Sequence, residues 1–159
     1  MSNASRRIVL AGLVVAVVDF AYVYVLWVLV LQKIGVQRLA QSIATGLLGN
    51  YALTGGAATA LVGLALHALI AYAWTVGFWL VLRASGTIQR WTYVSTGAAA
   101  VGVAYGALIW LAMDLVVLPL SRARPTPVAS GIFWLNLVEH MLLVGPPLVL
   151  ILTNARRST

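Results

Sequence analysis

The sequence predicts an all-α protein, a four-helix transmembrane bundle with a short amphipathic interfacial helix between spans one and two. Of its 159 residues, 62% are hydrophobic and only 8% are charged, and the mean hydropathy is +1.00. A typical soluble domain has about 45–50% apolar and about 25% charged residues, so this chain has too little polar surface to cover its apolar side chains in water. The same composition argues against disorder. We therefore treat residues 1–159 as a single integral membrane domain.

Four apolar runs are long enough to cross a bilayer, whose hydrocarbon core of about 30 Å needs about 20 helical residues. They cover approximately residues 8–31, 57–82, 93–118 and 132–152. Side chains that favour the headgroup level lie near several predicted ends, namely Trp27, Trp79, Trp91, Tyr93 and Trp134. In the third run, Gly102 and Gly106 form a smooth face for close helix packing, which we expect to lie within the chain rather than across a dimer.

The basic residues predict the orientation of the spans, because an excess of Lys and Arg marks the cytoplasmic side. Six lie on the side of the two termini: Arg6, Arg7, Arg83, Arg90, Arg156 and Arg157. Four lie on the other side: Lys33, Arg38, Arg122 and Arg124. We expect a multi-pass protein of a bacterial inner (plasma) membrane with both termini in the cytoplasm. The cations form no dense patch, so the expected partner is the lipid bilayer and not nucleic acid.

The segment 32–56 predicts the interfacial helix. Apolar residues recur on one face (Val36, Leu39, Ala40, Ile43 and Leu47), and Gln37, Arg38 and Gln41 fall on the other. A re-entrant segment is the alternative, because Gly46, Gly49, Gly55 and Gly56 would let the chain turn back. The second connection, 119–131, is rich in proline, and Ser130 is a candidate N-cap for span four. Pro146 and Pro147 should kink or break that span.

Ionisable residues inside the apolar runs are the candidate functional site, because each is costly at membrane depth. Asp19, His67, Glu139 and His140 all fall near the midplane, and Asn136 shares a helix face with the last two. Asp114 lies near the outer end of span three. Three tyrosines, Tyr22, Tyr72 and Tyr105, could add hydroxyl groups. The expected buried polar or ion site is therefore Asp19, His67, Asn136, Glu139, His140 and Asp114.

Three interpretations of this set are open. Asp19–His67 and Glu139–His140 could be hydrogen-bonded pairs that only fix the helix register. The set could be a proton or cation site, because burial favours the neutral forms of carboxyl and imidazole groups and a mixed cluster then exchanges protons near neutral pH. It could also be a ligand set, in which His67 and His140 bind haem b or a chlorin. In the same interpretation, both histidines and the two acids could hold a metal of unknown identity.

Signatures of soluble enzymes are missing from the sequence. It contains no GxxxxGK[ST] loop, no GxGxxG motif after a strand and no GxSxG elbow. Cysteine is absent, which excludes thiol chemistry. We assign no catalytic residues and expect a small polytopic membrane protein without obvious enzymatic activity, proton- or cation-coupled through the cluster. The alternative is an accessory subunit of a larger membrane complex that holds a pigment through His67 or His140. A homo-oligomer fits either function.

Several short segments resemble the YagU-like family of uncharacterised bacterial inner-membrane proteins. They are QSIATGLLG (41–49), TGGAATALVGLALH (54–67), VVLPLS (116–121) and EHMLLVGPPLVL (139–150), together with the mid-membrane acid of span one. The similarity extends over nearly the whole chain, although Glu139 is adjacent to His140 here rather than spaced apart from it. The resemblance implies a link to acid tolerance and carries no established activity, substrate or cofactor.

Overall fold

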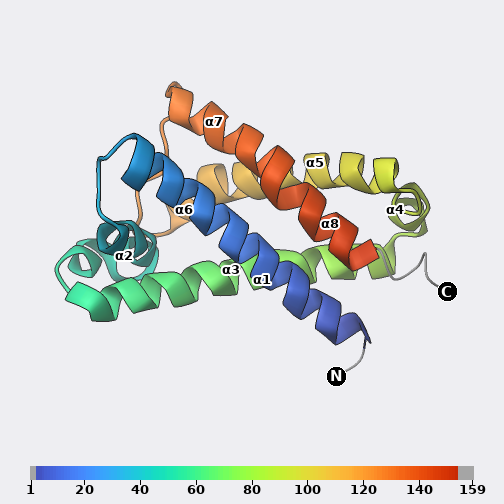
Figure 1. Ribbon diagram of the computed structural model, residues 1–159, viewed down its shortest axis with the longest axis horizontal. Helices are drawn as coiled ribbons and strands as arrows, with labels where there is room; N and C mark the ends of the chain where they lie inside the picture. Colours follow the sequence, from blue (N-terminus) through green and yellow to red (C-terminus); the bar gives the residue numbers. More distant parts are fainter. Residues whose placement is uncertain (1–2, 154–159) are drawn as a thin grey trace.

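A computed structural model describes residues 3–153, in which four long apolar helices form an elongated bundle (Figure 1). The helices that could cross a membrane are Asn3–Val30, Gly56–Ala84, Ser95–Leu120 and Gly131–Thr153. Each contains most of the corresponding predicted apolar run, and the part of the chain that is described has no β-strand. The structure therefore confirms the predicted all-α, four-helix bundle.

Three of the four spans change their hydrogen-bonding pattern along their length. Span one consists of α1 (Asn3–Tyr24) and the π-helix η1 (Val25–Val30), and span two is the single helix α3 (Gly56–Ala84). Span three consists of α5 (Ser95–Ala112), the π-helix η3 (Met113–Val117) and the short α6 (Leu118–Leu120). Span four consists of α7 (Gly131–Glu139), the π-helix η4 (His140–Val144) and α8 (Gly145–Thr153).

The π-helices explain how the chain passes its membrane prolines. The N–H of Gly145 donates to the carbonyl oxygen of His140, five residues back, and α8 then continues through Pro146 and Pro147. Proline has no N–H, so it leaves a backbone carbonyl one turn earlier without its usual donor. A π-helical turn before the proline is one way to give such carbonyl groups another hydrogen-bond donor. Of the two effects predicted for these prolines, a kink or a break of span four, the break does not occur. Span three has a π-helical turn of the same kind before Pro119, where the N–H of Leu118 donates to the carbonyl oxygen of Met113.

Spans three and four approach each other closely through glycine. Gly106 faces the backbone carbonyl of His140, and Gly145 faces that of Gly102, so closely that a β-carbon at either glycine would overlap the facing oxygen. Gly102 likewise lies against the backbone of Pro146. The structure thus confirms that the glycine face of span three packs within the chain, as small-residue faces of membrane helices commonly do.

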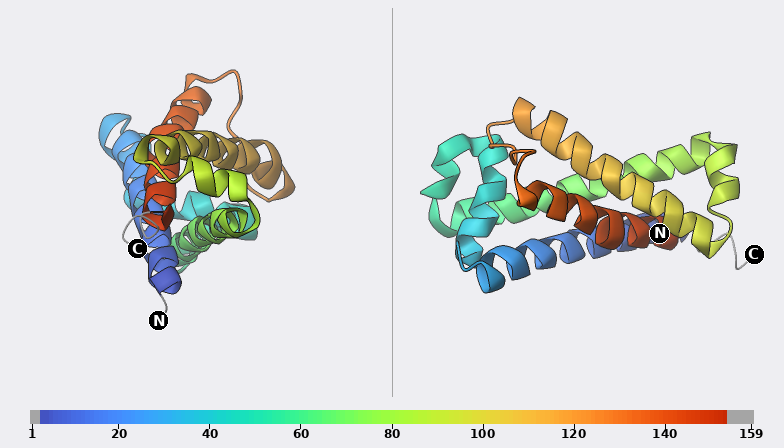
Figure 2. Two further views of the ribbon diagram at one scale, coloured as in Figure 1. Left: turned by 90° about the vertical axis from the view of Figure 1, so that its right-hand side faces the viewer. Right: turned by 90° about the horizontal axis from the view of Figure 1, so that it is seen from above.

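The connecting segments gather at opposite ends of the bundle (Figures 1 and 2). One end holds α2 (Val36–Leu48), the 3-10 helix η2 (Gly49–Leu53) and the loop after α6, whose Arg122 donates its backbone N–H to Gly46. The other end holds α4 (Gly86–Trp91) together with the starts and ends of spans one and four. At the start of α7, the hydroxyl of Ser130 accepts a hydrogen bond from the N–H of Phe133, which confirms the predicted N-cap.

The helix between spans one and two is present, but its inner face differs from the prediction. Gln41 was expected on the polar face, and this is wrong: it is buried beside Leu39, Ala40 and Ala44. Its side-chain N–H group donates to the carbonyl of Gly56 at 3.0 Å and to the hydroxyl of Thr59 at 3.2 Å. A buried amide is tolerated because it is hydrogen-bonded. The helix α2 is therefore held to α3 by a polar contact as well as by apolar packing.

Candidate functional site

Three of the residues predicted to form a buried polar site converge in the middle of the bundle. Asp19 comes from α1, Glu139 from the end of α7 and His140 from the start of η4. One ligand atom from each of the three lies within 4.8 Å of the others. Glu139 and His140 are only 4% and 8% exposed. Because ionisable groups are rare and costly at this depth, their convergence identifies the candidate site.

His67 extends the cluster onto span two. Its Nε2 lies 3.9 Å from a carboxylate oxygen of Asp19 and 2.9 Å from the backbone carbonyl of Ala16. A carbonyl oxygen can only accept, so Nε2 carries a proton and donates to it. The edge of the ring also meets Phe20, at 5.7 Å between centroids. Asp19 and His67 thus lie at ion-pair distance, but the hydrogen bond predicted between them is replaced by the bond to Ala16. His67 Nδ1 is the ring nitrogen left for another ligand.

The second predicted pair is also present. Nδ1 of His140 lies 2.5 Å from Oε2 of Glu139 and 3.0 Å from the backbone carbonyl of Asn136. The carbonyl oxygen of Asn136 can only accept, so Nδ1 is the protonated nitrogen and Nε2 is the one that could bind a metal or cofactor. Within residues 3–153, both carboxylate oxygens of Glu139 are buried and neither accepts a hydrogen bond, although Oε2 is in ion-pair contact with His140. Oε1 is therefore an unused acceptor at the centre of the cluster.

Tyr22 and Asn136 add neutral polar groups to the same region. The hydroxyl of Tyr22 donates to the side-chain oxygen of Asn136 at 3.3 Å, which links span one to span four. The other two candidate tyrosines donate elsewhere, Tyr72 to the carbonyl of Val9 and Tyr105 to that of Trp74. Of the three hydroxyl groups considered, only that of Tyr22 bonds to a residue of the cluster.

Asp114 is not part of the converging group. It is 1% exposed and lies in η3, and its Oδ1 accepts a hydrogen bond from the backbone N–H of Thr126 at 3.1 Å. This bond connects the end of span three to the loop that precedes span four. Asp114 therefore has a structural partner of its own, near the end of span three where the sequence placed it.

Sequence reasoning did not single out Trp110, which borders the site from span three. Its ring centroid lies 5.1 Å from that of His140, and its Nε1 is buried without a hydrogen-bond partner in the described part of the chain. The available signal was its position four residues after Gly106, on the face that packs against His140. With Trp110, all four spans contribute a side chain to the surroundings of the cluster.

These features define a class of protein, a four-span membrane protein that encloses a polar Asp/Glu/His cluster between its helices. Comparisons with protein families, with curated proteins and with solved structures found no match. The functional argument therefore depends on the geometry of the cluster.

Proposed function

We propose that this protein acts in proton- or cation-coupled membrane function through Asp19, His67, Glu139 and His140. The observation that carries the proposal is the convergence of two carboxylates and an imidazole within 4.8 Å inside an apolar bundle. Charged carboxylates at membrane depth cost at least about 2.5 kcal/mol each unless they are neutralised. A bound proton or a bound cation provides that neutralisation.

The composition of the cluster supports a variable charge. Two carboxylates carry up to two negative charges, and two imidazoles carry between zero and two positive charges. The unpartnered Oε1 of Glu139 offers a place for an incoming proton or cation. A mixture of imidazole nitrogen and carboxylate oxygen suits protons and first-row divalent metals better than Na⁺ or K⁺.

The proposal includes a location and an assembly. We place the protein in a bacterial inner membrane with its termini in the cytoplasm, in agreement with the arginines at the start of span one and at the end of span two. Only four spans leave little room for a complete pathway beside the cluster. We therefore propose that the protein works as a homo-oligomer or within a larger membrane complex. Membership of the YagU-like family, with its link to acid tolerance, is part of the same proposal.

Ion flux in proteoliposomes tests the function. An imposed pH gradient should dissipate faster in vesicles with the wild-type protein than in empty vesicles, and Asp19→Asn or Glu139→Gln should abolish the difference. Divalent-cation uptake is measured in parallel with a metal-sensitive dye. Asp114→Asn is the matched control, because it neutralises a buried acid outside the cluster. Wild-type vesicles without any pH- or metal-dependent flux, or an equal loss with Asp114→Asn, would contradict the proposal.

A further inference from the structure

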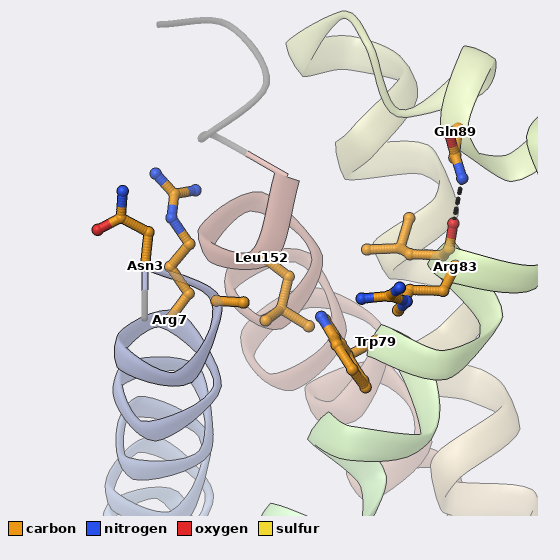
Figure 3. A pocket seen from close by; sticks show the side chains of 8 residues that line it. Asn3, Arg7, Trp79, Arg83, Gln89 and Leu152 are labelled. Atoms are coloured by element: carbon orange, nitrogen blue, oxygen red, sulfur yellow. Dashed lines mark hydrogen bonds between the residues drawn. The ribbon is translucent and has the colours of Figure 1, made fainter. Parts of the chain in front are cut away.

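A second polar feature lies at the end of the bundle that holds α4, away from the buried cluster. A cavity of about 400 Å³ opens there between α1, α3, α4 and α8 (Figure 3). Asn3 and Arg7 reach it from α1, Trp79 and Arg83 from α3, and Leu152 from α8. Its volume is within the range of small-molecule sites, about 300–1,000 Å³.

The cavity is lined by both apolar and cationic side chains. Leu82 and Leu152, which are 2% and 7% exposed, form part of its lining. The guanidinium carbon of Arg83 lies 5.1 Å from the centroid of the Trp79 ring, which holds it by a cation–π contact. Arg7 donates a long hydrogen bond of 3.4 Å to the carbonyl of Ile151. Both arginines are thus anchored by neutral groups.

The chain supplies no side-chain carboxylate to balance these two charges. Its three acidic residues are Asp19, Asp114 and Glu139. Two of them belong to the buried cluster, and Asp114 is bonded to Thr126. The salt bridges among residues 3–153 involve histidine and not arginine. Two fixed guanidinium groups in one cavity therefore present donors to an anion from outside the chain.

We propose that this cavity binds the phosphate group of an anionic molecule, with Arg7 and Arg83 as the charged ligands. Guanidinium groups match phosphate geometry through paired N–H donors. The apolar side chains of Leu82 and Leu152 can contact the hydrocarbon part of the molecule that carries the phosphate. The cavity lies at the end of apolar spans, where lipid headgroups are found, so the phosphate comes either from an anionic lipid or from free phosphate.

Lipid binding to the purified protein, measured by native mass spectrometry, separates these sources. One arm titrates phosphatidylglycerol, a second titrates zwitterionic phosphatidylcholine, and a third adds millimolar inorganic phosphate to the first. The test variant is Arg7→Gln/Arg83→Gln. The control is Lys33→Gln/Arg124→Gln, which removes the same charge from exposed residues at the opposite end. Circular dichroism checks folding, and the exposed Arg83→Gln alone replaces the double variant if that variant does not fold.

The wild type and the control should prefer phosphatidylglycerol, and the test variant should bind it at least roughly tenfold more weakly, because each surface cation contributes about a factor of five. Displacement by inorganic phosphate would assign the site to the phosphate group itself, and lack of displacement would assign it to the lipid headgroup. Equal binding of the two lipids by the wild type without any phosphate effect, or an equal loss in both variants, would overturn the proposal. Neither result depends on ion flux through the buried cluster.

Discussion

Nδ1 of His140 lies 2.5 Å from Oε2 of Glu139, although the two residues are neighbours in the sequence. Adjacent side chains of a regular α-helix diverge and do not face each other. Here the α-helix ends at Glu139 and a π-helix begins at His140, so the pair lies where the helical pattern changes. Such single-turn π-helices are frequent at functional sites.

This relationship predicts strong coupling between the two side chains. His140→Leu should destabilise the protein by about 3–5 kcal/mol, because it leaves a buried carboxylate without its partner. Glu139→Leu/His140→Leu should cost less than the sum of the single changes. Denaturant unfolding in detergent micelles of the wild type, both single variants and the double variant gives the coupling energy. Additive costs would show that the pair does not interact.

The close contact of spans three and four predicts a sharp difference between two glycines. Gly106→Ala should lower stability by about 1–3 kcal/mol, because the added methyl group meets the carbonyl oxygen of His140. Gly77→Ala is the matched control, since the nearest atom is the Tyr105 hydroxyl at an ordinary 3.5 Å. Thermal unfolding in micelles should show a lower midpoint for the first variant only. Equal midpoints would contradict the close packing.

Docking of α2 on α3 is expected to depend on Gln41. Gln41→Leu should cost about 1–3 kcal/mol, because it removes the hydrogen bonds to Gly56 and Thr59 from a buried position. Gln37→Leu, on the exposed side of the same helix, should have little effect. Amide hydrogen exchange resolved along α2 should speed up in the first variant and stay unchanged in the second. Unchanged exchange in both would show that apolar packing alone holds α2.

Asp114 is expected to order the loop before span four. Asp114→Ala removes the acceptor for the N–H of Thr126, so limited trypsin digestion after Arg122 should become several-fold faster. Asp114→Asn keeps a side-chain oxygen and should digest at the wild-type rate. Mass spectrometry of the fragments identifies the cleaved bond. Equal rates for all three proteins would show that the hydrogen bond does not restrain the loop.

An absorption spectrum separates the proposed function from pigment binding. We expect purified protein to lack a Soret band, because the proposed function uses the cluster for a proton or a cation. Haem would need Nδ1 of His67 and Nε2 of His140, the ring nitrogens that do not donate to protein oxygen atoms. A Soret band that disappears in His67→Ala and His140→Ala would instead establish haem binding. The two variants should first be shown to fold by circular dichroism.

Much of the fold follows from composition and periodicity. Apolar runs of the right length place the four spans to within a few residues, because the thickness of the bilayer sets the length of a spanning helix. Gln41 shows where this reasoning fails. Its polarity predicts exposure, but the carbonyl of Gly56 and the hydroxyl of Thr59 provide partners that no local pattern reveals.

By itself the sequence determined that ionisable side chains lie at mid-membrane depth, because the position of a residue within an apolar helix sets its depth. Only the tertiary structure decided which of them meet. The rotation and crossing of the helices bring Asp19 to Glu139 and His140, direct Asp114 to a loop instead and place Trp110 beside the imidazole. Helix rotation is set by close packing at residues such as Gly106, and that packing depends on contacts between distant parts of the chain.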